Sequence, residues 1–293
     1  MPDYVNWFVN REKQYHGFLK MLAHETPKTI MLIEAPADMG KTWLIQKMRH
    51  YCDQNGVPAM HIDFRDRRPY DYLSLARRVR DQMGARYFNP LTETINNFTG
   101  VNINLSAGSS SGGVKFGDID VRDLTDSSLH IQEIAGGDIV KDNQFHIQAD
   151  SEMARRAAEI RINDAFFACL AKLREKGPVV FLFDSYEEVT PEAECWLCDH
   201  LILQMNEGQL SNALIIIAGR KTPDLGPALK PFAAKTGLDL FLEEHVREYI
   251  VDRRRIEGLD LETIVKTSGG FPGLLAKMAD LASMDVQDDD DWL

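Results

Sequence analysis

The sequence has few cysteines and no long apolar run. Its 293 residues include only four cysteines, too few for a disulfide-stabilised scaffold of this length. Cys195 and Cys198 have C-x-x-C spacing, but no second cysteine pair or histidine pair completes a zinc site, so we interpret them as packing residues of an amphipathic helix. No segment approaches the roughly 18 to 20 apolar residues that span a bilayer. These absences predict a soluble, cytoplasmic protein with no membrane partner.

Basic residues are outnumbered by acidic ones. There are 33 Lys and Arg residues against 45 Asp and Glu residues, a formal net charge of −12, and residues 288–291 are four consecutive aspartates. An acidic surface repels the phosphate backbone, so nucleic acid is a disfavoured partner and any such contact would have to be local. Arginines cluster within residues 65–68, 77–80 and 253–255, and we interpret these clusters as solvated helix faces or helix ends.

A strand followed by a phosphate-binding turn is the strongest signal in the chain. Residues 29–45, TIMLIEAPADMGKTWLI, place an apolar run before Gly40, Lys41 and Thr42. This matches the P-loop motif G-x-x-x-x-G-K-[ST] except that Ala35 stands at the opening position, where a Cβ restricts a positive φ. Backbone N–H groups and the helix N-terminus would attract phosphates, Lys41 would reach the β- and γ-phosphates, and Thr42 would ligate Mg²⁺. The predicted ATP- or ADP-binding residues here are Ala35, Pro36, Ala37, Asp38, Met39, Gly40, Lys41, Thr42 and Trp43.

A second apolar strand ends in an aspartate. Residues 178–188, PVVFLFDSYEE, run through five apolar residues to Asp184. Such runs are typical of parallel strands buried on both faces, and α/β sheets bind ligands at the carboxyl ends of their strands. Asp184 would hold Mg²⁺ through water, while Glu187 or Glu188 would orient and deprotonate an attacking water. The alternative is a helix-capping aspartate followed by an acidic first turn.

A third apolar run, ALIIIA at residues 213–218, is followed by Gly219 and Arg220. At that strand end Arg220 would face the γ-phosphate and belong to the catalytic set with the two glutamates. The alternative, a surface arginine that closes a loop before Pro223, has equal support from the residues alone.

Hydrophobic periodicity predicts alternating strands and helices, the pattern of an α/β fold. We expect strands at residues 29–33, 59–64, 178–184, 213–218 and 238–242, and helices at 41–55, 73–84 and 193–205. The β-α-β-α order predicts a parallel sheet with right-handed crossovers. A helix after Glu243 and another over residues 272–284 predict a small helical lid.

Residues 98–148 differ from the rest, because polar and apolar residues alternate and Gly, Ser, Asn and Asp are frequent. The pattern predicts short strands separated by glycine-containing turns, and the alternative is a flexible polar loop. We therefore divide the chain into residues 1–88, the first half of a nucleotide-binding core; 89–150, a β-rich insertion; 151–242, the second half of the core; and 243–293, the lid with an acidic tail.

These motifs together resemble the STAND class of signal-transducing P-loop ATPases, neighbours of the AAA+ and origin-recognition ATPases. The matching features are the F-x-N-R-E lead at residues 8–12, the P-loop, the Asp184 strand, the sensor-like Arg220, and a G-x-P element at residues 270–272. The resemblance implies a parallel five-stranded sheet of order 5-1-4-3-2 and ATP or ADP bound between core and lid. It also implies that Pro272 packs beside the adenine and that Arg11 lies near the same pocket.

The chain departs from that class at Ala35, at Ser185 after Asp184, and in the insertion, so binding is better supported than hydrolysis. Members of the class continue into a winged helix and sensor repeats, which we expect either from a partner or from a longer form of this chain. Our leading hypothesis is an ATP-dependent switch with slow hydrolysis that controls assembly with protein partners or with itself. Two alternatives stay open: a DNA-acting ATPase of the origin-recognition kind, and a non-hydrolysing interaction module that works through the insertion.

Overall fold

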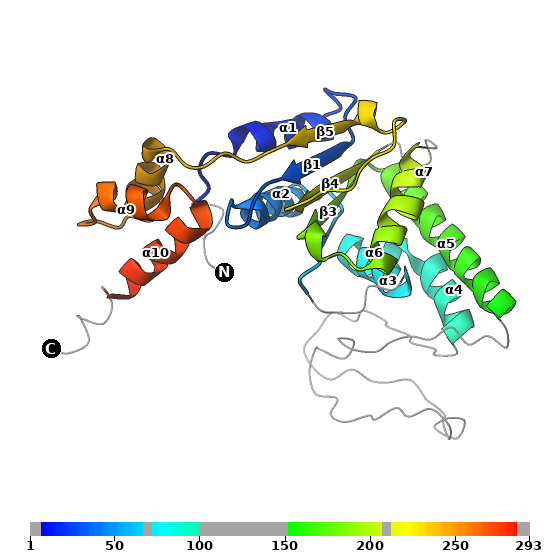
Figure 1. Ribbon diagram of the computed structural model, residues 1–293. Helices are drawn as coiled ribbons and strands as arrows, with labels where there is room; N and C mark the ends of the chain where they lie inside the picture. Colours follow the sequence, from blue (N-terminus) through cyan, green and yellow to red (C-terminus); the bar gives the residue numbers. More distant parts are fainter. Residues whose placement is uncertain (1–6, 67–71, 100–151, 207–211, 286–293) are drawn as a thin grey trace, which may run out of the picture. The chain divides into compact units, whose positions relative to one another are not determined.

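The computed structural model describes residues 7–66, 72–99, 152–206 and 212–285 (Figure 1). Its contacts divide the chain into two compact units, one formed by Met1–Phe88 with Ala168–Leu293 and the other by Asn89–Phe167. The first unit holds a sheet, the helices that cover it and a helical lid. The second unit holds the helix α4 and most of α5.

A parallel five-stranded sheet forms the centre of the first unit, with the strand order β2-β3-β4-β1-β5. The strands are β1 (Ile30–Glu34), β2 (Ala59–Asp63), β3 (Val179–Asp184), β4 (Ala213–Gly219) and β5 (Ala233–Thr236). Every residue of β3 and β4 is buried, as expected of central strands covered on both faces. The predicted fold class and the predicted order 5-1-4-3-2 are confirmed.

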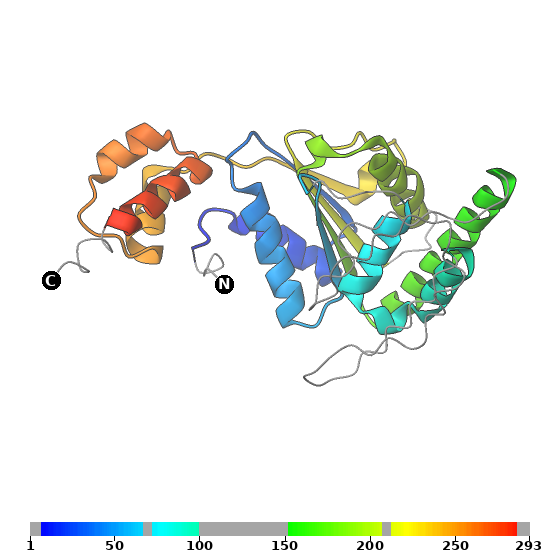
Figure 2. The same ribbon diagram turned by 90° about the horizontal axis from the view of Figure 1, so that it is seen from below.

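Helices cover both faces of the sheet (Figure 2). On one face, α1 (Glu12–Leu22) and α2 (Lys41–Gln54) pack Phe18, Leu44 and Met48 against alternate residues of the central strands. On the other face, Phe183 of β3 meets the ring of Trp196 with centroids 6.5 Å apart. The helix α3 (Tyr72–Met83) packs beside β2.

The predicted helix over residues 193–205 is built from three consecutive segments: α6 (Pro191–Cys195), a π-helix (Trp196–Ile202) and α7 (Leu203–Asn206). Thr190 caps its start by accepting a hydrogen bond from the Ala193 N–H. Cys195 is exposed and Cys198 is half-buried, and both thiols are free, so the interpretation of the pair as packing residues is wrong for Cys195.

The fifth strand differs from its predicted position. It is Ala233–Thr236, whereas the sequence predicted residues 238–242, which instead form an extended link toward the lid. Leu238 and Phe241 of this link are buried, and the Phe241 N–H donates to the Gly270 carbonyl at 2.8 Å. Two apolar residues of the link are therefore buried outside the sheet, while Leu240 and Leu242 are exposed.

The lid, residues 243–285, packs around a small apolar cluster that also includes Val9 and Phe241. It consists of α8 (Glu243–Arg247), a π-helix (Glu248–Arg253), α9 (Leu261–Ser268) and α10 (Pro272–Asp285). Val246, Ile250 and Leu275 are fully buried in it. The helix α9, which the sequence analysis missed, is capped by Asp260, whose carboxylate accepts hydrogen bonds from the N–H groups of Glu262 and Thr263.

The second unit begins with a helix, although residues 89–150 were predicted to be β-rich. The helix α4 covers Asn89–Thr99, with Leu91 and Ile95 buried four residues apart on one face. It is joined by α5 (Glu152–Arg174), whose Arg161 guanidinium lies 6.0 Å from the centre of the Phe98 ring. The strands predicted within residues 100–148 lie outside the described residues. No helix in the described ranges is both long and apolar enough to cross a membrane.

Candidate functional site

The loop between β1 and α2 brings the backbone into an unusual shape. Asp38 has φ of 59° and Gly40 has φ of 83°, both in the left-handed region. Ala35 is not left-handed, so the restriction that its Cβ imposes on positive φ does not distort the loop. The Ala35 N–H donates to the Gly219 carbonyl at 3.2 Å, which fixes the start of the loop against the end of β4.

Lys41 begins α2 and turns its side chain back into the loop. Its Nζ donates to the carbonyls of Ala35 at 2.7 Å and Pro36 at 2.5 Å, and only 9% of the residue is exposed. Burial lowers the pKa of the Lys41 ammonium, while the negative charges of Glu187 and Asp184 act to raise it. Lys41 of the first motif and two carboxylates of the second motif therefore lie close enough to influence each other's charge.

Asp184 ends β3 with a buried carboxylate. Its Oδ1 accepts a hydrogen bond from the Ser185 N–H at 2.8 Å, and its Oδ2 has no hydrogen-bond partner within bonding distance in the described ranges. Burial raises the pKa of this carboxyl, and the nearby Thr42 hydroxyl partly opposes that shift. Ser185 has φ of 58° and turns the chain directly after the carboxylate.

Asp184 and Thr42 suit a magnesium ion that also binds phosphate. Mg²⁺ in nucleotide sites uses few protein ligands and completes its octahedral shell with water and phosphate oxygens. A buried carboxylate oxygen that lacks a hydrogen-bond partner among the described residues, next to a hydroxyl, supplies such a place. No cluster of three or more His, Cys, Asp or Glu residues in the described ranges could hold a metal without such help.

Glu187 and Glu188 are both held by Arg220. They lie in the 3₁₀ turn Tyr186–Glu188 that follows β3. Glu187 accepts from the Arg220 backbone N–H at 2.7 Å and from its Nε at 2.8 Å, whereas Glu188 accepts once, from Nη2 at 3.1 Å. The Glu187 side chain is 16% exposed and that of Glu188 is 50% exposed. Of the two, Glu187 is therefore the more buried and the more firmly held.

The protonation of Glu187 depends on these hydrogen bonds. Burial alone would raise the pKa of this carboxyl, but the N–H groups of Arg220 outweigh it and the net pKa is lowered. The contact needs a glycine before Arg220, because a Cβ at Gly219 would lie 2.9 Å from Glu187 Oε2 and 2.5 Å from the Lys221 carbonyl oxygen. The end of β4 is thus shaped to receive the glutamate.

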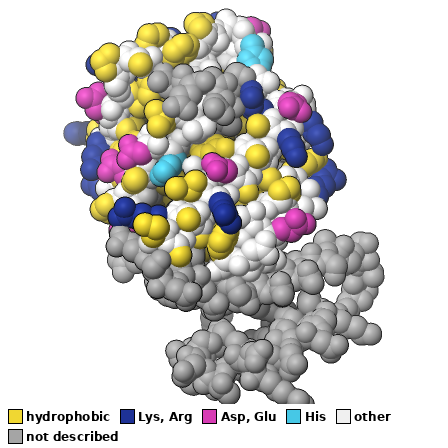
Figure 3. Space-filling view, turned by 90° about the vertical axis from the view of Figure 1, so that its right-hand side faces the viewer, with side chains coloured by type: hydrophobic (Ala, Val, Ile, Leu, Met, Phe, Trp, Pro, Cys, Tyr) yellow, Lys and Arg dark blue, Asp and Glu magenta, His cyan; other side chains and the backbone are white. Residues whose placement is uncertain are grey.

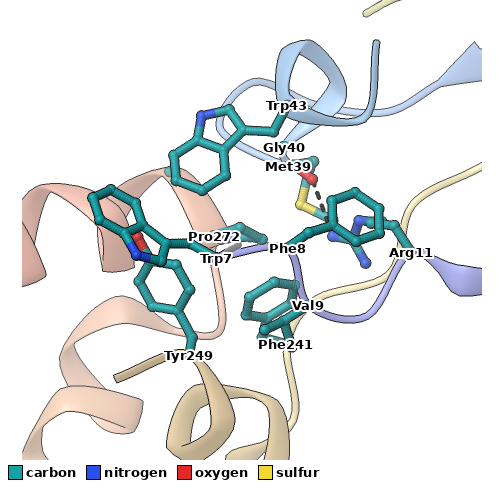
Figure 4. Close-up of a pocket in the computed structure, with 11 residues that line it drawn as sticks. Trp7, Phe8, Val9, Arg11, Met39, Gly40, Trp43, Phe241, Tyr249 and Pro272 are labelled. Atoms are coloured by element: carbon teal, nitrogen blue, oxygen red, sulfur yellow. Dashed lines mark hydrogen bonds between the residues drawn. The ribbon is translucent and has the colours of Figure 1, made fainter. Parts of the chain in front are cut away.

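An aromatic pocket opens beside the loop (Figure 4). Its empty space, counted out to the solvent at its mouth, is about 420 Å³. Figure 4 shows Trp7, Trp43 and Tyr249 gathered on one side, with Phe8 and Arg11 on the other. The residues that line it are Trp7, Phe8, Val9, Arg11, Met39, Gly40, Trp43, Phe241, Tyr249, Pro272 and Gly273.

Arg11 connects three segments around this pocket. Its Nη2 donates to the Met39 carbonyl at 3.0 Å and to the Asp239 carbonyl at 2.9 Å, and its Nη1 donates to the Asn10 carbonyl at 2.6 Å. The guanidinium also lies 5.1 Å from the centre of the Phe241 ring. Burial lowers the pKa of Arg11 to about 10, which leaves it charged at neutral pH. Arg11 is thus a fixed structural cation.

The start of α10 touches the loop directly. The Gly273 N–H donates to the Asp38 carbonyl at 2.7 Å, and Lys277 Nζ lies 3.8 Å from Asp38 Oδ1. A Cβ added to Gly40 would lie 3.8 Å from Pro272 Cβ, an ordinary contact distance. The residues predicted to surround one ligand, from the loop and from the lid, are therefore neighbours.

Sequence reasoning found the loop, the strand ends, Arg11 and Pro272, but missed several neighbours. The missed residues are Trp7, Val9, Phe241, Tyr249 and Gly273 in the pocket, and Asp63 and Arg65 beside Asp184. The aromatic residues that flank the lead motif were a usable signal for the pocket. The position of Arg65 had no such signal, because its arginine cluster matched an ordinary solvated face.

Comparisons with known proteins agree with this fold. No protein-family model and no curated protein sequence matches the chain. Among solved structures, Cdc6p from Pyrobaculum aerophilum is similar with a TM-score of 0.51 and 12% identity, over 97% of this chain and 65% of that one. A Signal Transduction ATPase with Numerous Domains (STAND) protein with a tetratricopeptide repeat sensor, from Pyrococcus horikoshii, has a TM-score of 0.46 and 14% identity, over 92% of this chain and 29% of that one.

The chain thus spans less than two thirds of the length of either of these proteins. At 12% identity the likeness to Cdc6p speaks for the fold and for nothing finer. The sheet order 5-1-4-3-2, the loop between β1 and α2 and the aspartate at the end of β3 belong to the same architecture. The chain has the fold of a P-loop NTPase.

Proposed function

We propose that this chain is an ATP-binding switch that holds ATP or ADP with Mg²⁺, hydrolyses ATP slowly, and controls assembly with partner proteins or with further copies of itself. The observation that supports the proposal most is the meeting of Lys41, Asp184 and Glu187 at the carboxyl edge of one parallel sheet. Such an edge, next to a loop with left-handed Asp38 and Gly40, is where α/β folds bind phosphates.

The phosphates would lie against the loop and the first turn of α2. The loop offers backbone N–H groups, and the helix adds the positive end of its dipole. Among the residues that the structure describes, the Lys41 ammonium donates two short hydrogen bonds, both to carbonyl oxygens of the same loop. Exchange of those carbonyls for phosphate oxygens gives Lys41 a charged partner in place of neutral ones.

The metal would lie beside Thr42 and Asp184. Bound there, Mg²⁺ supplies positive charge that offsets the negative charge on the transferred phosphoryl group. Thr42 contributes its hydroxyl, and Asp184 contributes the carboxylate oxygen that has no partner in the described ranges. Burial raises the pKa of Asp184, and a cation at this position would offset that effect by favouring the ionised carboxylate.

We assign the water-orienting role to Glu187 and a supporting role to Glu188. Glu187 is the more buried of the two, and its charge acts on Lys41. The hydrogen bonds from Arg220 lower the pKa of Glu187, which makes it a weaker base. Turnover is therefore slow while Arg220 is hydrogen-bonded to Glu187. Movement of Arg220 to a γ-phosphate would remove these hydrogen bonds and make Glu187 a stronger base.

The aromatic pocket suits the base of the nucleotide. Its walls are aromatic and aliphatic, with Pro272 from the lid and Trp43 from the helix that starts at the phosphates. A planar heterocycle stacks well on such rings. Because the lid and the loop both line the pocket, a bound nucleotide would tie the position of α10 to the state of the loop, which is the basis of the proposed switch.

Nucleic acid is not part of the proposal. On the face shown in Figure 3, Lys and Arg side chains lie among acidic and apolar ones, and the described side chains of that face do not form a single basic patch. The overall charge of −12 also disfavours binding to the negatively charged backbone of nucleic acid.

Calorimetric titration with ATP and ADP, with and without Mg²⁺, tests the proposal. We expect Lys41→Ala to weaken ATP binding by about 10- to 100-fold, the loss of a charge-assisted hydrogen bond to phosphate. Lys266→Ala on α9 is the matched control, because this lysine is exposed and lies on another helix. Unchanged ATP affinity in Lys41→Ala would refute nucleotide binding at this loop.

A further inference from the structure

A tight turn after β2 holds an arginine next to Asp184. The turn spans residues 63–66 and is closed by the Asp66 N–H, which donates to the Asp63 carbonyl at 3.0 Å. Phe64 is 4% exposed and stacks on Phe183 with ring centroids 5.9 Å apart. Its N–H donates to the Asp184 carbonyl at 3.1 Å. The backbone on which Arg65 stands is therefore fixed to the end of β3.

The Arg65 guanidinium makes its strongest contacts with Asp63. Nε lies 3.0 Å from Asp63 Oδ1, and Nη2 lies 2.5 Å from Oδ2. The Arg65 backbone N–H also donates to Asp63 Oδ1 at 3.0 Å. Burial alone would raise the pKa of Asp63, but these bonds from Arg65 outweigh it and the net pKa is lowered. Asp63 thus stays ionised and keeps the arginine at this strand end.

The same guanidinium reaches the two oxygens that suit Mg²⁺. Its Nη2 lies 3.5 Å from Thr42 Oγ1 and 4.0 Å from Asp184 Oδ2. The buried carboxylate therefore has a cation nearby, but the distance is too long for a hydrogen bond. A metal ion bound by the same oxygens, with metal–oxygen distances of about 2.0–2.1 Å, would lie within about 6 Å of Nη2, so the two positive charges would repel each other.

We propose that Arg65 is a cationic placeholder for the metal: its guanidinium balances Asp184 when no divalent cation is bound, and it moves away from Asp184, still paired with Asp63, when one binds. This inference rests on the proposed role of Thr42 and Asp184 as the metal site. The withdrawal is easy because Asp63 already holds the guanidinium through two side-chain nitrogens, so Arg65 keeps its main partner throughout.

The placeholder answers a problem that the buried aspartate creates. A carboxylate without a cation inside a protein is destabilising, and it favours protonation instead. A tethered guanidinium nearby reduces that penalty, yet it is exposed enough to move, since 57% of the Arg65 side chain is accessible. Arg65 therefore competes with the metal and sets the concentration at which the metal binds.

Binding of Mn²⁺ to the nucleotide-free protein tests the inference, with free Mn²⁺ measured by electron paramagnetic resonance. Mn²⁺ is the probe because it accepts the same oxygen ligands as Mg²⁺. Removal of a competing positive charge about 4 Å away should tighten Mn²⁺ binding in Arg65→Ala by about fivefold or more. Arg65→Gln should tighten Mn²⁺ binding in the same way, and Arg65→Lys should bind Mn²⁺ with about the affinity of the natural chain. Asp184→Asn should remove the tight site in each background.

Arg253→Ala is the matched control, because this exposed arginine pairs with Glu248 in the lid. Mn²⁺ affinity that is equal or weaker in Arg65→Ala and Arg65→Gln would overturn the placeholder. So would a selective loss of ATP over ADP affinity with unchanged Mn²⁺ binding, which would make Arg65 a γ-phosphate ligand. Failure of the natural chain to bind ATP or ADP in calorimetry would instead refute the proposed function, and the nucleotide-free Mn²⁺ result would still decide the role of Arg65.

Discussion

At the level of one residue, Asp184 has a buried carboxylate that suits the proposed metal site but lowers stability. Only 1% of it is exposed, and one of its carboxylate oxygens has no hydrogen-bond partner in the described ranges. Burial raises the pKa of the carboxyl, so the folded chain binds a proton there more readily than the unfolded chain. A residue chosen for packing alone would not be an aspartate at this position.

Asp184→Asn should therefore change stability and ligand binding in opposite directions. Without nucleotide and in the presence of EDTA, the substitution removes a buried charge, and we expect the free energy of unfolding at neutral pH to rise by about 1 kcal/mol or more. With ADP and Mg²⁺ present, the variant should gain much less stability than the natural chain. Urea unfolding in the two buffers measures both effects.

The difference in stability between the natural chain and Asp184→Asn should depend on pH. The pKa of Asp184 is raised in the folded chain. Its contribution to the free energy of unfolding is therefore fully present below the ordinary aspartate pKa of 3.8 and is lost as the pH rises through the higher folded pKa. The amide that replaces this carboxyl in the variant cannot ionise, so the stability advantage of the variant should grow across that window. An advantage that is the same at all pH values would contradict the pKa shift.

The two glutamates offer a second comparison between neighbouring residues. Glu187 is held by two Arg220 nitrogens and acts on Lys41, whereas Glu188 is half exposed and makes one contact with Arg220. We expect Glu187→Gln to slow phosphate release by about 100-fold or more, as for loss of a general base, and Glu188→Gln to keep most of the activity. Single-turnover phosphate release at saturating ATP distinguishes them, and a larger loss in Glu188→Gln would reverse the assignment.

Among the elements, the strand, loop and helix around the P-loop were predictable from local sequence. An apolar run, a Gly-Lys-Thr triplet and an amphipathic helix place β1, the loop and α2 within a residue of their observed bounds. The strand ends at Asp184 and Gly219 were predictable for the same reason, because long buried runs leave few alternatives. Whether Ala35 distorts the loop could be decided only from the backbone angles.

Those angles lead to a prediction about the loop as an element. Gly40→Ala puts a Cβ on a left-handed residue, which should lower the free energy of unfolding by about 1–2 kcal/mol and weaken ATP binding. Ala35→Gly, which restores the standard motif, should not strengthen binding, and it should lower stability by about 0.4–1 kcal/mol through the unfolded chain. Urea unfolding and calorimetry of both variants test this, and tighter ATP binding in Ala35→Gly would show that the loop is strained by the alanine.

Other elements could not be located from local patterns. The edge strand β5 reads Ala-Ala-Lys-Thr and is mostly half-exposed, so it lacks the apolar run by which inner strands are recognised. The run at residues 238–242 has the expected apolar residues, but Phe241 packs beside Arg11 and Gly270, and Leu240 and Leu242 are exposed. The helix predicted at residues 193–205 is present, but the π-helical turns of its middle part, Trp196–Ile202, were not predicted from the apolar spacing.

At the scale of the whole first unit, the lid has a small apolar cluster that also includes Val9 and Phe241, and α10 adds direct contacts with the loop. The closest is between Gly273 and Asp38, and Lys277 adds an ion pair of 3.8 Å. Sequence periodicity predicted helices in the lid, and the G-x-P resemblance pointed to Pro272. The contact itself depends on a backbone carbonyl and a glycine, which carry no pattern, so only the structure could place it.

This contact makes Gly273 a test of communication between lid and loop. A Cβ added there would lie 2.6 Å from Asp38 Oδ1 and 2.9 Å from Asp38 Cα, which forces α10 away from the loop. We expect Gly273→Ala to weaken ADP binding by about tenfold, the cost of such overpacking, while the sheet stays folded. Gly226→Ala is the matched control, because a Cβ there meets nothing within 4 Å. If calorimetry gives both variants the affinity of the natural chain, and circular dichroism shows both folded, then closure of α10 on Asp38 does not control nucleotide binding.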